Sequence, residues 1–136
     1  MAEYNLVDNQ QLVGIFSYRF KHVGSTLASL SVNRLGHNTE IIGDPDADAG
    51  PQSKKNLADL VKRMDSAVIL QEKPTDGLDI LDMVRNQDPN NHVCFVYEGQ
   101  RPPIEETDTT NVIISPEVTP SPEFREYLSK IPGIRK

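Results

Sequence analysis

The sequence predicts a three-layer α/β domain built on a mainly parallel sheet of about five strands. Apolar runs alternate with helical patterns along most of the chain, which indicates right-handed crossovers in a doubly wound sheet. The runs are almost continuously apolar, as is typical of strands covered on both faces. A chain of 136 residues is long enough for one such domain with a single core. We therefore assign residues 12–136 to the domain and the polar residues 1–11 to a loose N-terminal arm.

Each predicted strand is an apolar run bounded by polar or turn-forming residues. In chain order the strands are Leu12–Tyr18, Thr39–Ile42, Ala67–Gln71, His92–Tyr97 and Asn111–Ser115. Between the last two strands, the segment Glu98–Thr110 contains glycine, prolines and acidic residues, and it predicts a long loop.

The predicted helices follow apolar residues at helical spacing. The clearest stripe is formed by Leu57, Leu60, Val61 and Met64, at positions i, i+3, i+4 and i+7, and Ser53 is the expected cap of this helix. In chain order the helices are Ser25–Leu35, Lys54–Met64, Gly77–Asn86 and Pro122–Ile131.

Composition excludes several classes of function. The formal net charge is -6, whereas a general nucleic-acid binder carries a basic surplus, so we expect no general binding to DNA or RNA. No apolar run approaches the ~20 residues that span a bilayer, and the first residues lack the pattern of a signal peptide. We expect a cytoplasmic protein without membrane contact. The single cysteine, Cys94, lies in an apolar run and predicts a small buried side chain. For so small a sheet we also expect a homodimer.

The first candidate site is the loop after the first strand, because ligands of doubly wound folds bind where strands end and helices begin. Free backbone N–H groups at the start of the next helix favour an anion, and basic residues lie just upstream. This pattern suits a phosphate or a ribose phosphate, although it matches neither the P-loop nor the dinucleotide fingerprint. The alternative is that Ser25 only caps the helix and the basic side chains are solvated. The predicted ligand-binding residues are Tyr18, Arg19, Lys21, His22, Gly24, Ser25 and Thr26.

A second candidate is Asp44, at the end of the second strand. A carboxylate there can accept hydrogen bonds from ribose hydroxyls, although a solvated turn residue is the alternative. The surrounding D-x-D-x-D pattern imitates a calcium loop, but it has Ala49 in place of the turn glycine and Lys55 in place of the bidentate glutamate. We predict no metal site and no cofactor, since no His, Cys and Asp spacing supports zinc.

The third candidate comprises Asp76, Asp79 and Asp82, which follow the third strand at a spacing of three residues. Neighbouring members share a helical face. A carboxylate raised above the end of a strand can act as a nucleophile on a sugar or as a base. Asp76 can also cap the helix. The alternative is an acidic, water-facing helix start in which Asp82 pairs with Arg85.

From Leu12 to Gly99 the chain resembles the nucleoside 2-deoxyribosyltransferase superfamily and related small Rossmann-like proteins, including TIR-like nucleotide hydrolases. The resemblance lies in the opening strand and loop, the segment Arg34–Glu40 and the segment Met64–Leu70. That family carries a motif close to D-S-G-T-x-x-E after the third strand, with the glutamate as nucleophile at the anomeric carbon. In this chain Asp76 falls on the leading aspartate, whereas Gly77 and Leu78 do not match the Ser-Gly pair.

Further along the same motif, Asp79 replaces the threonine and Asp82 falls on the glutamate, with a side chain shorter by one methylene. The resemblance implies a flavodoxin/Rossmann-like fold and cleavage or transfer of an N-glycosidic bond. Asp82 would be the nucleophile or base, with Asp79 as the second choice. Whether the chain is an enzyme is left open by these departures.

Two functions follow from these patterns. The first is binding of a nucleoside, nucleotide or sugar phosphate at the carboxyl ends of the strands. The second is a non-enzymatic, flavodoxin-like protein-interaction module. In that module the acidic segment Glu105-Glu106-Thr107-Asp108 and the proline-rich tail would supply the contacts.

Overall fold

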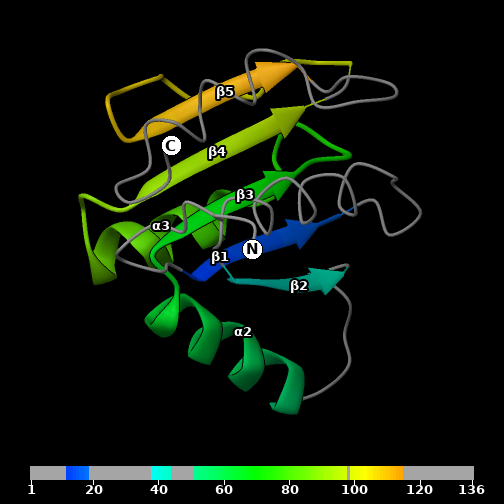
Figure 1. The fold of residues 1–136 in the computed structure, drawn as a ribbon. Coiled ribbons are helices and arrows are strands. Elements are labelled where there is room, and N and C mark those ends of the chain that lie inside the picture. Colours follow the sequence, from blue (N-terminus) through cyan, green and yellow to red (C-terminus); the bar gives the residue numbers. More distant parts are fainter. Residues whose placement is uncertain (1–11, 19–37, 44–50, 98, 115–136) are drawn as a thin grey trace, which may run out of the picture.

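The computed structural model describes residues 12–18, 38–43, 51–97 and 99–114 of the chain. These residues form a five-stranded, entirely parallel sheet with the strand order β2-β1-β3-β4-β5 (Figure 1). The strands are β1 (Leu12–Ser17), β2 (Asn38–Gly43), β3 (Ser66–Leu70), β4 (His92–Tyr97) and β5 (Thr110–Ile114).

The predicted fold class and all five predicted strands are confirmed. Observed and predicted strand ends differ by one residue, or by none. Strands β1, β3 and β4 are recognisable because their interior residues are apolar on both faces, as in a sheet covered on both sides. In the register of the two central strands, Ile15 of β1 lies opposite Val68 of β3, and both side chains are fully buried.

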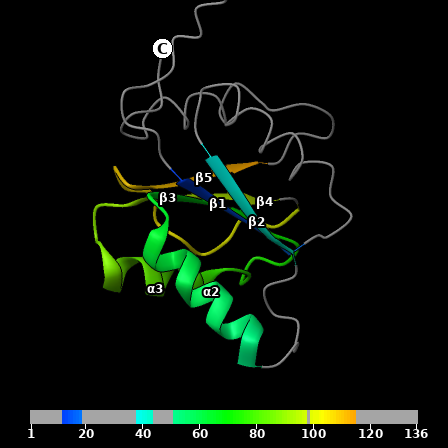
Figure 2. The same cartoon turned by 60° about the horizontal axis from the view of Figure 1, so that its bottom comes forward.

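Two of the predicted helices lie within the described residues, and both are confirmed. They are α2 (Pro51–Arg63) and α3 (Leu78–Gln87), and both pack on the same face of the sheet (Figure 2). Because α2 begins at Pro51, Ser53 lies inside its first turn, and the prediction that Ser53 caps the helix is wrong. Proline is well suited to the first helical position, where its missing N–H costs nothing. The predicted helices Ser25–Leu35 and Pro122–Ile131, and the predicted arm of residues 1–11, lie outside the described residues.

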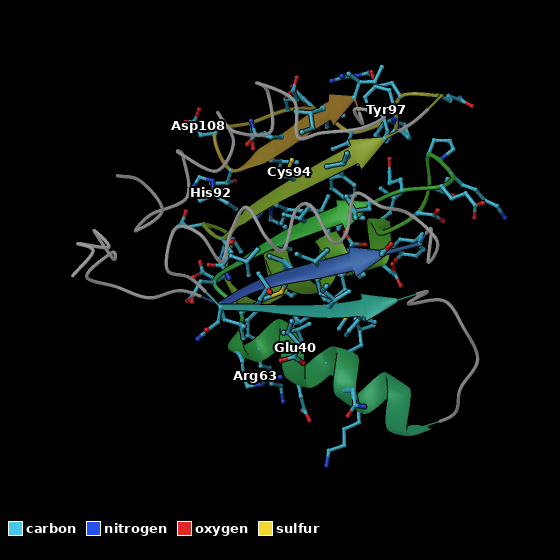
Figure 3. The ribbon with its side chains drawn as sticks, turned by 45° about the vertical axis from the view of Figure 1, so that its right-hand side comes forward. Glu40, Arg63, His92, Cys94, Tyr97 and Asp108 are labelled. Carbon is cyan, nitrogen blue, oxygen red and sulfur yellow. The ribbon has the colours of Figure 1, made fainter. Side chains whose placement is uncertain are left out.

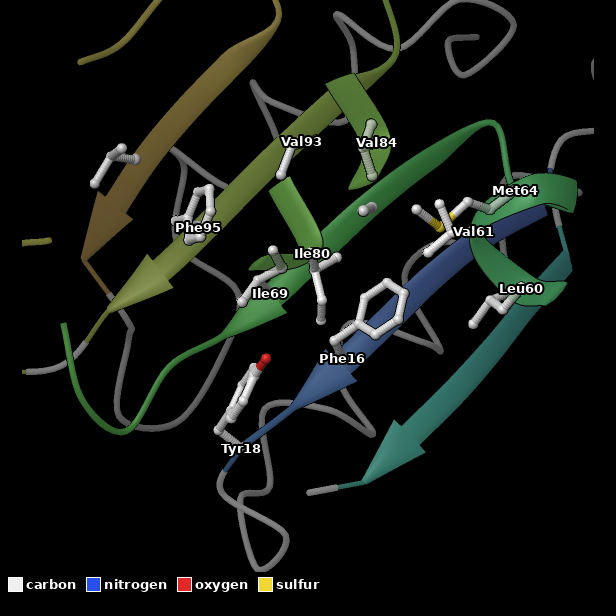
Figure 4. Close-up of a cluster of buried hydrophobic side chains, with 12 residues drawn as sticks. Phe16, Tyr18, Leu60, Val61, Met64, Ile69, Ile80, Val84, Val93 and Phe95 are labelled. Carbon is white, nitrogen blue, oxygen red and sulfur yellow. The ribbon is translucent and has the colours of Figure 1, made fainter. Parts of the chain in front are cut away.

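The core between the sheet and these two helices is built from alternate residues of the strands (Figure 4). Phe16 and Phe95 are its largest fully buried side chains, and Leu60 and Ile80 meet them from α2 and α3. The intervening residues in the middle of β1, β3 and β4 face the other side of the sheet and are buried too, whereas Ile41 of β2 is 47% exposed. Cys94 on β4, for example, has no exposed surface, which confirms the prediction of a small buried side chain.

Different contacts lie at the two edges of the sheet. Beside β2, Arg63 of α2 reaches Glu40 and donates to both carboxylate oxygens at 3.1 Å (Figure 3). Beyond β4, the connection to β5 contains no helix or strand in its described residues, 99–109, in agreement with the predicted loop. Pro102 is buried and Ile104 packs against the core on the side of α2 and α3.

Candidate functional site

The strand order reverses between β1 and β3, and in folds of this type a ligand binds outside the carboxyl ends of those two strands. Two residues mark this place, Tyr18 directly after β1 and Gln71 directly after β3. The Tyr18 N–H donates to the carbonyl of Leu70 at 3.0 Å, and the Gln71 N–H donates to that of Val96 at 2.9 Å. The strand ends are therefore tied together by backbone hydrogen bonds.

Gln71 is one of the two most deeply buried polar residues at this place, since Gln71 and Ser17 are each 2% exposed. Its Nε2 donates to the Pro74 carbonyl at 3.2 Å and to the Asp76 carbonyl at 2.8 Å. Its Oε1 is buried and has no hydrogen-bond partner among the described residues. An amide is neither a nucleophile nor a general base at neutral pH. Gln71 therefore braces the turn between β3 and α3.

Asp76 braces the same turn from its other end. Its Oδ2 accepts the Glu72 N–H at 3.0 Å and the Lys73 N–H at 2.7 Å, and the residue is 9% exposed. The expectation that Asp76 caps α3 is wrong, since Gly77 is the N-cap residue and no side chain caps the helix. With φ of +84°, Gly77 has a left-handed backbone, and the Asp76 carboxylate bonds backward to the turn instead of forward to the helix.

Asp79 and Asp82 are both exposed, and both lie on α3. Asp79 is in the first turn, where its Oδ1 accepts the Ile80 N–H at 2.9 Å. Asp82 is the fifth residue of the helix, which places it about 6 Å along the axis from the first residue at 1.5 Å per residue. Ile80 and Val84 are the buried residues of α3. Asp76 therefore lies in the turn at the end of β3, whereas Asp82 lies further along α3.

Tyr18 is the one member of the predicted ligand-binding set within the described residues, and it is 6% exposed and belongs to the core cluster. The others, Arg19, Lys21, His22, Gly24, Ser25, Thr26 and Asp44, lie outside the described residues. Their convergence with the acidic residues of α3 stays a prediction. Among the described residues, no three His, Cys, Asp or Glu side chains are grouped so that they could hold a metal ion.

Sequence reasoning named Arg85 only as a partner of Asp82, and it missed that Arg85 joins three segments at the amino ends of β4 and β5. It donates to the Asn91 carbonyl at 2.6 Å, to the Thr109 carbonyl at 3.1 Å, and to the Thr110 hydroxyl. A further bond reaches the Pro89 carbonyl at 3.3 Å. An arginine in the last turn of a predicted helix is the signal that could have pointed to this role, because the last turn of a helix favours cations.

Comparison with known proteins supports the fold and does not identify a family. The solved structure of a response regulator receiver domain protein from Bacillus halodurans is similar, with a TM-score of 0.59 and 14% sequence identity. The match covers 94% of this chain and 99% of that chain. No protein family model and no curated protein matches the chain. In the part of the chain that the structure describes, no helix is long and apolar enough to cross a bilayer. Of the predicted resemblance, the general flavodoxin/Rossmann-like fold is supported, and the deoxyribosyltransferase family is not.

Proposed function

We propose that the domain is a non-enzymatic module of flavodoxin-like fold that docks on a protein partner. One observation carries this proposal. At the carboxyl ends of β1 and β3, Gln71 and Asp76 direct hydrogen bonds to the backbone of the turn that contains them. The Gln71 Nε2 and the Asp76 Oδ2 close this turn, so these two atoms are not available to bind a ligand or to move a proton.

Two further features support a docking role. The chain shares its fold with a receiver domain of a response regulator, which is part of a regulatory protein. The segment before β5 presents Glu105, Glu106 and Asp108 to solvent. Exposed charges of one sign steer a partner of opposite charge and raise the rate of association.

The competing function is binding of a nucleoside or nucleotide, with a homodimer as the expected assembly. It depends on residues 19–26 and Asp44, with Asp82 as the reacting group. A thermal-shift screen of nucleosides, nucleotides and sugar phosphates separates it from the docking role. A ligand present at 100 times its Kd stabilises the folded state by about 2.7 kcal/mol, which raises Tm by on the order of 5–10 °C.

On the docking proposal, no member of this panel shifts Tm, and no nucleoside is turned over. Stabilisation by a nucleotide, together with turnover that Asp82→Ala abolishes, would overturn the proposal in favour of the enzyme. Turnover that persists in Asp82→Ala would instead remove the catalytic role from that residue.

The positive test is binding to a purified partner. A protein that co-purifies with the full chain is identified, purified and titrated by calorimetry at low and high salt. We expect affinity to fall with salt and to fall at least about tenfold when Glu105 and Asp108 are both changed to lysine. Asp82→Lys reverses an equally exposed charge on α3 and is the matched control. Equal affinity for all three proteins would contradict docking at the acidic segment.

A further inference from the structure

The segment before β5 lies back along the outer edge of that strand. It ends in a tight turn at which Thr107 pairs twice with Thr110. The Thr107 N–H donates to the Thr110 carbonyl at 2.9 Å, and the Thr107 Oγ1 accepts the Thr110 N–H at 3.1 Å. Because β5 is the last strand of the sheet formed by the described residues, these two groups of Thr110 lie where a further strand would pair. Thr107 therefore occupies the position of a residue in a neighbouring strand.

Glu106 continues this contact one step along the edge. Its Oε1 accepts the Val112 N–H at 3.1 Å, and its Oε2 accepts a hydrogen bond from Arg101 at 3.3 Å. Val112 is 5% exposed, whereas the Arg101 and Glu106 side chains are 49% and 47% exposed. We call residues 101–109 the strap. Through Thr107 the strap bonds the N–H and carbonyl of Thr110, and through the Glu106 carboxylate it accepts the N–H of Val112.

The first part of the strap has apolar contacts with the core, whereas residues 105–108 are exposed. Pro102 is buried and Ile104 packs against the core, while residues 105–108 are all exposed. Residues 105–108 can therefore leave the edge of β5 while the apolar contacts of the strap stay in place. Opening requires the loss of the three hydrogen bonds that Glu106 and Thr107 make with β5.

We propose that the edge of β5 beneath the strap is the docking site of an extended, cationic segment of a partner protein. This inference rests on the proposed docking function and names its surface. The incoming segment replaces Glu106 and Thr107 as the strand neighbour, and main-chain hydrogen bonds supply affinity, as in other cases of strand addition. At the end of the same edge Ile114 is 56% exposed, and Tyr97 lies opposite it on β4, so an apolar side chain of the partner finds a contact there.

The charge of the strap decides the kind of partner. It carries Glu105, Glu106 and Asp108 against Arg101, and all four side chains are exposed. Figure 3 shows Asp108 at the amino end of β5. A second copy of this chain pairing edge to edge would bring the same carboxylates together, and like charges facing each other destabilise strand pairs. A segment with lysine or arginine is favoured instead.

The test uses the full chain and a fluorescent heptapeptide, Lys-Thr-Val-Thr-Val-Thr-Lys, with fluorescence anisotropy as the readout. Glu106→Ala removes the carboxylate that covers Val112, and Glu105→Ala removes an equal charge that makes no such contact. We expect Glu106→Ala to bind the peptide about five- to tenfold more tightly than the wild type, because the strap competes less. Glu105→Ala should bind within about twofold of the wild type, since it weakens only the attraction between charges. If Glu106→Ala does not fold, Thr107→Ala carries the same expectation through the lost Oγ1 acceptor.

Amide hydrogen exchange supplies an independent readout. Exchange at Val112 should be on the order of tenfold faster in Glu106→Ala than in the wild type, and the peptide should slow it again. Equal peptide affinity in the wild type and both variants, or unchanged exchange at Val112, would overturn the inference. Self-association of Glu106→Ala without peptide would assign the edge to a second copy and overturn the cationic partner. A nucleotide that raises Tm would contradict the proposed function while leaving the peptide result unaffected.

Discussion

At the turn from β3 into α3, the neighbouring residues Asp76 and Gly77 stabilise the turn in different ways. The Asp76 carboxylate accepts two backbone N–H groups that the end of the strand leaves without a strand partner. Gly77 supplies a left-handed backbone, with φ of +84°, and its Cα lies against Ile69. A carboxylate that reads as a catalytic candidate in the sequence is thus part of the turn, and its chemistry is hydrogen-bond acceptance.

Asp76→Ala removes this acceptor and leaves the Glu72 and Lys73 N–H groups without it. We expect a loss of about 1–3 kcal/mol in the free energy of unfolding, measured by urea denaturation. Asp82→Ala, on the exposed part of α3, should stay within about 0.5 kcal/mol of the wild type. Equal losses in the two variants would contradict the assignment of Asp76 to the turn.

Gly77→Ala and Gly99→Ala form a matched pair, because both glycines have positive φ, +84° and +87°. A Cβ at Gly77 would lie 2.5 Å from the Ile69 Cγ2, whereas nothing lies within 4 Å of a Cβ at Gly99. Gly99→Ala should cost about 1 kcal/mol from backbone strain alone. Gly77→Ala should cost about 1–3 kcal/mol more, because crowding in the core is added. Thermal denaturation measures both losses of stability. Similar losses in the two variants would show that the Ile69 side chain can move to accommodate a Cβ at position 77.

At the scale of elements, secondary structure can be predicted from the sequence where a run of apolar residues dominates a segment. The strands β1, β3 and β4 could be found because most of their residues are apolar whichever face of the sheet they meet, whereas β2 and β5 also contain polar residues such as Glu40 and Asn111. The start of α2 was placed three residues late, because Ser53 is a good cap by type while Pro51 is the better first residue by geometry. The roles of Asp76 and Glu106 could not be predicted, since each depends on where a backbone N–H lies after the chain has folded. Glu106, for example, accepts from Val112 only because β5 is an edge strand.

Arg85 connects α3 to the starts of two strands, and this role gives a prediction for these elements. Arg85→Met keeps most of the side-chain length but removes all hydrogen bonds to the carbonyls, at a cost of about 2–4 kcal/mol in unfolding free energy. Arg63→Met breaks only the exposed pair with Glu40, whose side chains are 53% and 42% exposed, and should cost no more than about 1 kcal/mol. Chemical denaturation measures both. A larger loss in Arg63→Met would reverse the assignment.

At the scale of the whole molecule, every strand pair is parallel, so no two neighbouring strands are joined by a hairpin. The central pairing of β1 with β3 brings together residues more than fifty positions apart, such as Val13 and Ser66. Closing such long loops costs entropy before the contacts stabilise the chain. The core in Figure 4 therefore depends on contacts that are distant in sequence.

We expect refolding from urea to be slow for a domain of this size, in the range of milliseconds to seconds. Stopped-flow tyrosine fluorescence measures this refolding rate. The variant Phe16→Ala, which empties a fully buried position on β1, should cost about 3–5 kcal/mol in the free energy of unfolding. Complete refolding in less than about a millisecond would show that helix contacts, and not strand pairing, limit the rate.

Cys94 offers a native chemical reporter for the opening of the sheet. Its thiol has no exposed surface in the middle of β4, and it is the one cysteine in the sequence. A thiol reagent can therefore react only while the packing around the Cys94 side chain is open. The rate of labelling in the absence of denaturant measures how often that happens, and no engineered probe is required.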